Sequence, residues 1–303
     1  MIVVTGATGQ LGRLVVRHLI DLVPVDQIAV LVRDPTRATH PAGHGIEVRT
    51  ADHDVPSSLA GAFRPGDRVL LISGNQFGRR QAQHEAVISA AKNADVALLA
   101  YTSILGGPNT QFVIAADHHT TEQAIKSSGL PFSFLRNGWY TENYTAQLPT
   151  VLEHGVVVGT AASDSRLATA TRNDYAAAAA AVLAGAGHEN TTYELSGDEA
   201  WSLDEYTAHV SRQSGRDITY RQVPAAEYRQ LLSAGGLPDA MLDVFIETEN
   251  VIARGALALV TGDLRRLIGR PSTSLTAVIR DELNAIHSVA ADDEVIHRQR
   301  NRS

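Results

Sequence analysis

The chain contains no cysteine, only two lysines and no long apolar run. Without cysteine there are no disulfides, thiolate nucleophiles or cysteine-based zinc sites, so any redox chemistry requires a cofactor. Lys92 and Lys126 are the only lysines among 26 basic residues, which restricts the choice of a catalytic ammonium group. Because the first apolar segment stops at Thr5 and no later one is long enough to span a bilayer, we expect neither a secretory signal nor a transmembrane helix.

The formal net charge is −7, and 44% of the 303 residues are hydrophobic. An acidic surface does not favour the phosphate backbone of nucleic acids, so we expect no nucleic-acid partner. With no apolar run long enough to span a bilayer, we expect no membrane partner either. We expect a cytoplasmic protein, and these features are compatible with a homodimer. The length suits one large unit with a smaller appended lobe.

The first half of the chain alternates short apolar runs with longer amphipathic ones, which is typical of a parallel sheet covered by helices on both faces. Strands are expected at 2–5, 28–32, 46–50, 69–73, 96–102 and 132–136, with a seventh near 193–195. Helices are expected at about 11–22, 56–63, 79–94 and 115–128. The predicted fold class is α/β, a doubly wound parallel sheet.

After Arg136 this alternation ends, and a smaller, mainly helical substrate lobe is expected. Its expected helices are about 203–214, 225–234, 239–253 and 275–288, with a strand near 218–221. The alanine run 176–181 predicts a helix capped by Asn173 or Asp174. The predicted domains are 1–140 plus about 170–198, then about 141–169 plus 199–290, followed by a frayed polar tail at 291–303.

Gly6, Gly9 and Gly12 follow the first strand and open a helix. In this context the spacing predicts a Rossmann dinucleotide-binding loop. Gly6 permits the tight turn, Gly9 lets the backbone approach the pyrophosphate, and Gly12 lets the helix lie close to the sheet. The free N–H groups at the start of the helix then receive the phosphate.

The residues after the second and third strands bear on which dinucleotide binds. Arg33 directly follows the second strand and favours a 2′-phosphate, hence NADP(H). Asp34 precedes a proline and is interpreted as a turn-former. Asp52, after the third strand, either accepts from the adenine amino group or caps the helix that starts near Pro56.

The nicotinamide is expected at the carboxyl ends of strands four to six, because ligands bind there in doubly wound sheets. Candidate residues at those ends are Ser73, Gly74, Thr102, Asn137 and Tyr140. The usual short-chain dehydrogenase acid is a tyrosine with a lysine four residues later. No tyrosine in this sequence has one, so that proton-donor pair is missing.

The helix before the sixth strand carries two adjacent histidines. His118 could contact the nicotinamide ribose or donate a proton, and Glu122 on the same face could fix its tautomer. The alternative for His118, and the favoured one for His119, is an ordinary hydrogen-bonded residue. A zinc site would need a third ligand, and none is identified, so no metal is predicted.

Four aromatic residues could line a planar ligand near the same edge, or could simply pack between the lobes. They are Phe77, Trp139, Tyr140 and Tyr144.

Several segments together resemble the NmrA-like branch of the atypical short-chain dehydrogenase/reductases, and within it the NADPH:quinone oxidoreductase type 2 proteins. They include Val4–Gly12, Leu135–Tyr144, Ala170–Ala178 and Leu267–Pro271, and the block Leu135–Tyr140 is the most specific of them. The resemblance covers almost the whole chain. It implies a Rossmann fold with NADPH bound at Gly6, Thr8, Gln10, Leu11, Arg33 and Ser73.

The resemblance further implies that a quinone stacks on the nicotinamide and is reduced by two electrons. It also implies that His118 stands where related reductases carry lysine. The alternative is a catalytically weak NADP(H)-binding redox sensor, since a sensor needs no proton donor. Reduction or isomerisation of another unsaturated small molecule is a third interpretation.

Overall fold

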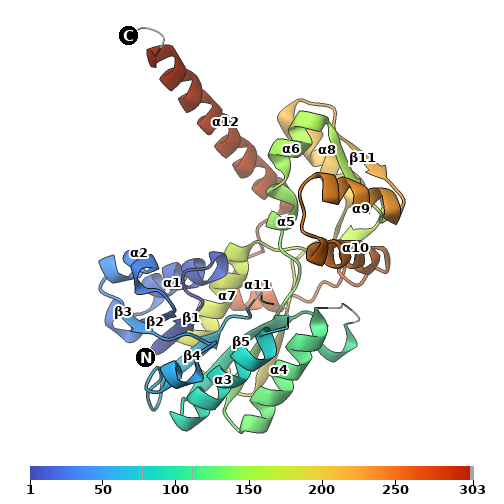
Figure 1. Cartoon of the computed structure of the whole chain (residues 1–303). Coiled ribbons are helices and arrows are strands. Elements are labelled where there is room, and N and C mark those ends of the chain that lie inside the picture. The colour runs from blue at the N-terminus through green and yellow to red at the C-terminus, as the bar shows by residue number, and fades with distance from the viewer. Residues whose placement is uncertain (75, 77, 111, 113, 301–303) are drawn as a thin grey trace. The chain divides into compact units, whose positions relative to one another are not determined.

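The computed structural model describes residues 1–300 apart from positions 75, 77, 111 and 113 (Figure 1). The described chain divides into two compact units. The first comprises Met1–Gly138, Thr171–Ser196 and Thr261–Ser272, and the second takes in the remaining described residues.

A seven-stranded parallel sheet in the order β3-β2-β1-β4-β5-β6-β9 forms the centre of the first unit. Its strands are β1 (Ile2–Thr5), β2 (Ile28–Val32), β3 (Glu47–Thr50), β4 (Arg68–Leu71), β5 (Leu98–Ile104), β6 (Phe132–Asn137) and β9 (Thr191–Leu195). Val3 pairs with Ala29 of β2 on one side and Val69 of β4 on the other. The strand order reverses between β1 and β4, so the predicted doubly wound fold is confirmed.

Helices cover both faces of this sheet, which explains why every residue of β1 and β2 is buried (Figure 1). Helices α1 (Gln10–Leu22) and α7 (Arg172–Ala184) lie on one face, and α3 (Arg80–Asn93) and α4 (Ala115–Ser128) on the other. The buried alanines of α7 let it pack closely against α1. The short helices α2 (Thr39–Gly43) and α11 (Asp263–Ile268) complete this unit and were not predicted.

Two predictions of local structure in the first unit are wrong. The helix expected at 56–63 is a single 3-10 turn, η3 (Pro56–Leu59), because Ala60 is extended and Gly61 adopts a φ of +77°. The cap of α7 is Thr171, whose hydroxyl accepts from the N–H of Asp174. The helix therefore starts earlier than the expected cap at Asn173 or Asp174, and both residues lie in its first turn.

The second unit is mainly helical, as predicted. Its helices are α5 (Glu142–Thr145), α6 (Leu148–His154), α8 (Leu203–Ser214), α9 (Ala225–Ala234), α10 (Asp239–Ala253) and α12 (Leu275–Arg300). Strands β7 (Val156–Gly159) and β11 (Thr219–Gln222) form a parallel pair, and β8 (Arg166–Leu167) and β10 (Trp201–Ser202) an antiparallel one. Ser202 and Glu205 form a capping box that starts α8.

The polar tail expected to fray from residue 291 is instead helical to Arg300 as the end of α12. The segment is polar but contains neither glycine nor proline, and its Ala, Glu, Gln and Arg residues favour helix. Among the residues described, no helix is both long and apolar enough to cross a membrane.

Candidate functional site

The loop between β1 and α1 forms a tight cradle of backbone. Gly6 adopts a φ of +60°, and its carbonyl accepts from the N–H of Gly9 at 2.9 Å. A Cβ atom on Gly12 would lie 2.3 Å from the Gly6 oxygen and 2.7 Å from Cα of Ala7. These contacts require glycine at the positions where the sequence predicted a turn and a close approach.

The start of α1 is open to a negatively charged ligand. Gly9 is its N-cap and offers no side-chain cap, and the first turn holds no acidic residue. The N–H groups of this turn have no partner within the helix, so they provide an anion site. Thr8 and Gln10 are accessible, whereas the Leu11 side chain is buried, so Leu11 can contribute only its backbone.

Arg33 and Asp34, at the end of β2, are engaged differently. Asp34 accepts from the hydroxyl of Thr36 at 2.6 Å and from its N–H at 3.0 Å. The hydroxyl bond is the main reason that the pKa of the Asp34 carboxyl is lowered. Asp34 is therefore occupied as a turn-former, as interpreted from the sequence, while the exposed Arg33 follows the strand directly.

Asp52 does not cap the turn at Pro56. The N-cap of η3 is Val55, and Asp52 instead accepts from the N–H of Asp54 at 3.0 Å. Its own N–H donates to Ser58 at 2.8 Å. The interpretation of Asp52 as a helix cap is therefore wrong, and its contact with the adenine stays a prediction.

Ser73, Gly74 and Thr102 come together at the carboxyl ends of β4 and β5. The N–H of Ser73 donates to Oγ1 of Thr102 at 2.8 Å, and the Thr102 hydroxyl lies 3.2 Å from Oγ of Ser73. The N–H of Gly74 donates to Nε2 of His84 at 3.2 Å. His84 was not predicted, and nothing in its local sequence marks it.

His118 is buried in the first turns of α4, and its Nδ1 lies 2.9 Å from the hydroxyl of Tyr101 on β5. Burial, with the nearby charge of Arg80, lowers the pKa of His118 to about 3. The predicted partner Glu122 is wrong for this role, because its carboxylate accepts from Arg136 and Ser103 instead. A spacing of four placed the two residues on one face but could not show these competing partners.

Arg136 joins three elements of the first unit through charged contacts. Its guanidinium donates to Glu122 of α4 at 2.6 Å and to Glu194 of β9 at 2.7 Å. Glu194 also accepts from the N–H of Gly106. His119 contacts the carbonyl of Gly107 through its Nε2, in agreement with the favoured interpretation of an ordinary hydrogen-bonded residue.

Asn137 ends β6, and its buried side-chain oxygen Oδ1 has no hydrogen-bond partner among the described residues. A buried acceptor left without a partner is rare and costly, which favours a ligand contact. Among the aromatic candidates, Trp139 and Tyr140 lie partly buried in the second unit, while Phe77 lies outside the described residues.

Tyr144 packs edge-on against Trp201 at 4.9 Å and Tyr206 at 5.8 Å between ring centroids, within the second unit. Trp201 in turn donates to Thr169 at 3.0 Å. These contacts favour the packing interpretation for Tyr144, and its contact with a ligand stays a prediction.

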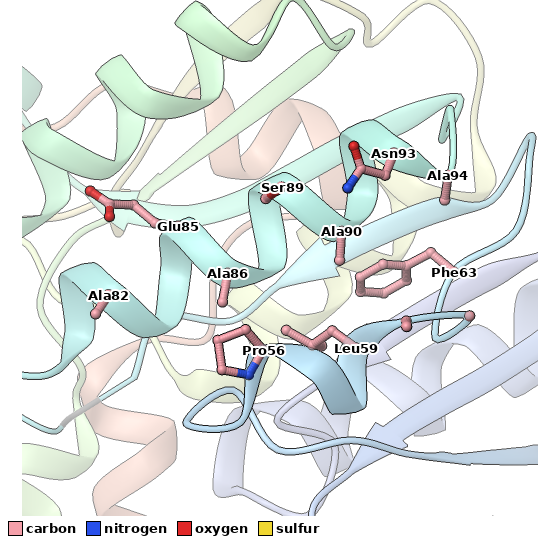
Figure 2. Close-up of a pocket in the computed structure, with 12 residues that line it drawn as sticks. Pro56, Leu59, Phe63, Ala82, Glu85, Ala86, Ser89, Ala90, Asn93 and Ala94 are labelled. Atoms are coloured by element: carbon pink, nitrogen blue, oxygen red, sulfur yellow. The ribbon is translucent and has the colours of Figure 1, made fainter.

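A pocket of about 660 Å³ lies between η3 and α3 in the first unit (Figure 2). Its wall combines Leu59 and Phe63 with small residues of α3 such as Ala86 and Ala90. None of the predicted site residues lines it. In the part of the chain that the structure describes, no group of three or more His, Asp or Glu side chains is placed to hold a metal ion.

The parallel sheet, the glycine cradle at its first strand-to-helix turn and the arginine after its second strand define a dinucleotide-binding Rossmann protein. The chain belongs to the NmrA-like family, whose model matches residues 1–259. The resemblance inferred from the sequence is thereby confirmed.

Known relatives match most of the chain. It is 43% identical over 284 residues to quinone oxidoreductase 2 of Escherichia coli (strain K12), covering 94% of this chain and 99% of that protein. The crystal structure of the NADPH-dependent quinone oxidoreductase from Escherichia coli with NADPH has a TM-score of 0.89 and covers 92% of this chain and 98% of that one. Triphenylmethane reductase of Citrobacter sp. with NADP(H) is 35% identical with a TM-score of 0.89, over 93% and 100% of the two chains.

Proposed function

We propose that the protein is an NADPH-dependent oxidoreductase that reduces quinones by two electrons. The observation that carries the choice of cofactor is the open start of α1 beside an exposed Arg33 whose neighbour Asp34 is already engaged. The Escherichia coli relative, named a quinone oxidoreductase, supports the choice of acceptor. In this proposal the first unit is the NADP-binding domain and the second is the substrate lobe.

The chain's own residues fit the cofactor in a defined way. The backbone from Gly6 to Gly12 receives the pyrophosphate, with Thr8 and Gln10 accessible beside it. Arg33 holds the 2′-phosphate through paired hydrogen bonds. Asp52 contacts the adenine. The remaining contacts come from the sheet edge and are made by Ser73, Gly74, Thr102 and His118.

When bound, NADPH supplies the hydride, and the protein needs only to position the acceptor and exclude competing reactions. The proposed catalytic residues are His118, Asn137 and Tyr140. Asn137 offers its unpartnered Oδ1 as a hydrogen-bond acceptor at the end of β6. Trp139 and Tyr140 supply planar contacts for the quinone, whereas the same role for Phe77 and for Tyr144, which packs on Trp201 and Tyr206, stays a prediction. A homodimer, a cytoplasmic location and the absence of a nucleic-acid partner remain predictions.

The test is NADPH oxidation by the purified protein with a panel of benzoquinones and naphthoquinones, in wild type and in Arg33→Ala. We expect quinone-dependent turnover that is faster with NADPH than with NADH. Arg33→Ala should weaken NADPH binding at least about tenfold and change NADH binding by no more than about twofold, since only NADPH carries the phosphate.

Arg17→Ala, which removes an exposed arginine from α1, is the matched control and should leave both affinities unchanged. Equal weakening of both cofactors by Arg33→Ala would remove Arg33 from the phosphate role. Tight NADPH binding without turnover on any quinone would favour the redox sensor.

A further inference from the structure

A chain of buried and partly buried hydrogen bonds starts at the backbone of Gly74 and has a fixed direction. Gly74 N–H is a donor, so Nε2 of His84 must accept, and the neutral ring then carries its proton on Nδ1. That Nδ1 lies 2.9 Å from Oγ1 of Thr121. The hydroxyl of Thr121 donates to the carbonyl of Asp117 at 2.8 Å. The oxygen of the same hydroxyl therefore accepts the hydrogen bond that Nδ1–H of His84 donates.

The neighbouring Tyr101 and His118 form a second hydrogen bond whose direction is also fixed. The Thr121 hydroxyl proton is committed to the Asp117 carbonyl, so Thr121 has none to offer Tyr101. The Tyr101 hydroxyl is fully buried; it lies 2.9 Å from Nδ1 of His118 and also interacts with the Thr121 side chain. The Thr121 oxygen already accepts a hydrogen bond from His84, and an imidazole nitrogen is a stronger acceptor than a hydroxyl oxygen, so the buried phenol donates its hydrogen bond to Nδ1 of His118.

We propose that Tyr101 is the positioning residue that fixes His118 as the neutral tautomer with its proton on Nε2. The inference rests on the proposed function for the role of His118, but the tautomer itself does not. His118 thereby presents an N–H donor at the carboxyl edge of the sheet, where an oxygen of cofactor or quinone would accept it.

The tautomer also decides what His118 does chemically. A neutral imidazole that keeps its Nε2 proton stabilises a developing negative charge on an oxygen by hydrogen bonding. Giving that proton up would demand another from the Tyr101 phenol, whose pKa burial raises. His118 is therefore a hydrogen-bond donor. The hydride brings two electrons and one hydrogen to the quinone, and solvent water supplies the proton that completes the hydroquinone.

The experiment is ¹⁵N NMR of the full chain labelled at histidine, with the His118 signals identified by their loss in His118→Gln. In wild type we expect a pyridine-type Nδ1 and a protonated Nε2. Tyr101→Phe should produce a mixture of tautomers and lower kcat about tenfold while the Kd for NADPH changes by less than about twofold, as expected for one lost hydrogen bond.

Tyr193→Phe is the matched control, because Tyr193 makes an analogous bond at 2.6 Å to Nδ1 of His188 in the same unit. It should leave the His118 signals and kcat unchanged. A proton on Nδ1 of His118 in wild type would overturn the proposal even if Tyr101→Phe failed to fold. So would a Tyr101→Phe protein that kept both the Nε2 tautomer and wild-type kcat. A wild-type protein with the expected tautomer but no quinone turnover would refute the proposed function alone.

Discussion

Gly12 is the glycine of the phosphate loop that has the least space. A methyl group there would meet the Gly6 oxygen and Cα of Ala7, which are backbone atoms and cannot rotate away. We predict that Gly12→Ala displaces α1 from the loop, lowers the free energy of unfolding by about 2 kcal/mol and abolishes NADPH binding. Urea unfolding and fluorescence titration with NADPH measure the two effects.

Gly43 provides the control for this substitution. It lies in α2, a Cβ there would meet no atom within 4 Å, and its φ is not positive. Gly43→Ala should be neutral or stabilise the protein by about 0.5 kcal/mol through the unfolded chain. Unchanged NADPH affinity in Gly12→Ala would show that the close approach of helix and loop does not shape the cofactor site.

Single residues were predictable where the local sequence determines their partner. Asp34 was interpreted as a turn-former from the following proline, and its hydrogen bonds to Thr36 confirm this. His118 was singled out as a candidate cofactor contact or proton donor, which stays a prediction, and its partner Tyr101 lies 17 positions away on another element. No helical spacing rule could reveal that contact.

At the scale of elements, α4, β6 and β9 are held together by one arginine. Arg136 donates to Glu122, which is 2% exposed, and to Glu194. Arg136→Ala would leave the Glu122 carboxylate buried without its counter-charge, so we predict a loss of roughly 3 to 5 kcal/mol in the free energy of unfolding. Chemical denaturation of the purified variant measures this.

The comparison is Arg221→Ala, which breaks an ion pair with Glu227 that is exposed on both sides, at 52% and 43%. Water screens such a pair, so its removal should cost less than about 1 kcal/mol. Similar losses in the two variants would mean that Arg136 contributes no more than a surface charge does.

The sequence predicted the elements of the first unit well because its central strands are buried on both faces and read as continuous apolar runs. The prediction was wrong at η3, where a helix was expected from Pro56 to residue 63. The structure has a single turn there, and Gly61 with its positive φ follows that turn. The prediction also missed the short strands β7, β8 and β10, which have no long apolar pattern and are defined by pairing with distant segments.

At the scale of the whole molecule, His84 and His118 are the described histidines whose pKa is lowered most, and both lie buried among polar partners. Burial lowers the pKa of His84 and of His118 to about 3, while an unfolded histidine titrates near 6.5. Below pH 6.5 the unfolded state therefore binds protons that the folded state does not. The contribution of both groups to stability is complete above that pH and is lost as the pH falls toward 3.

We predict that the free energy of unfolding decreases by at least roughly 2 to 3 kcal/mol for each pH unit between about 6 and 4, since each of these two protons contributes about 1.4 kcal/mol per unit. The pKa values of His53, His188 and His209 are also lowered, mainly by burial, and act in the same direction. The lowered carboxyl pKa values of Glu47 and Asp67 add the same sign only below about pH 4.5. Urea unfolding at pH 7, 6 and 5 measures the slope.

The double variant His84→Gln, His118→Gln should have a lower free energy of unfolding at pH 7. That free energy should change less between pH 6 and pH 5 than in the wild type, because glutamine does not titrate. A wild-type protein equally stable at pH 7 and pH 5 would contradict the burial of both rings in neutral form.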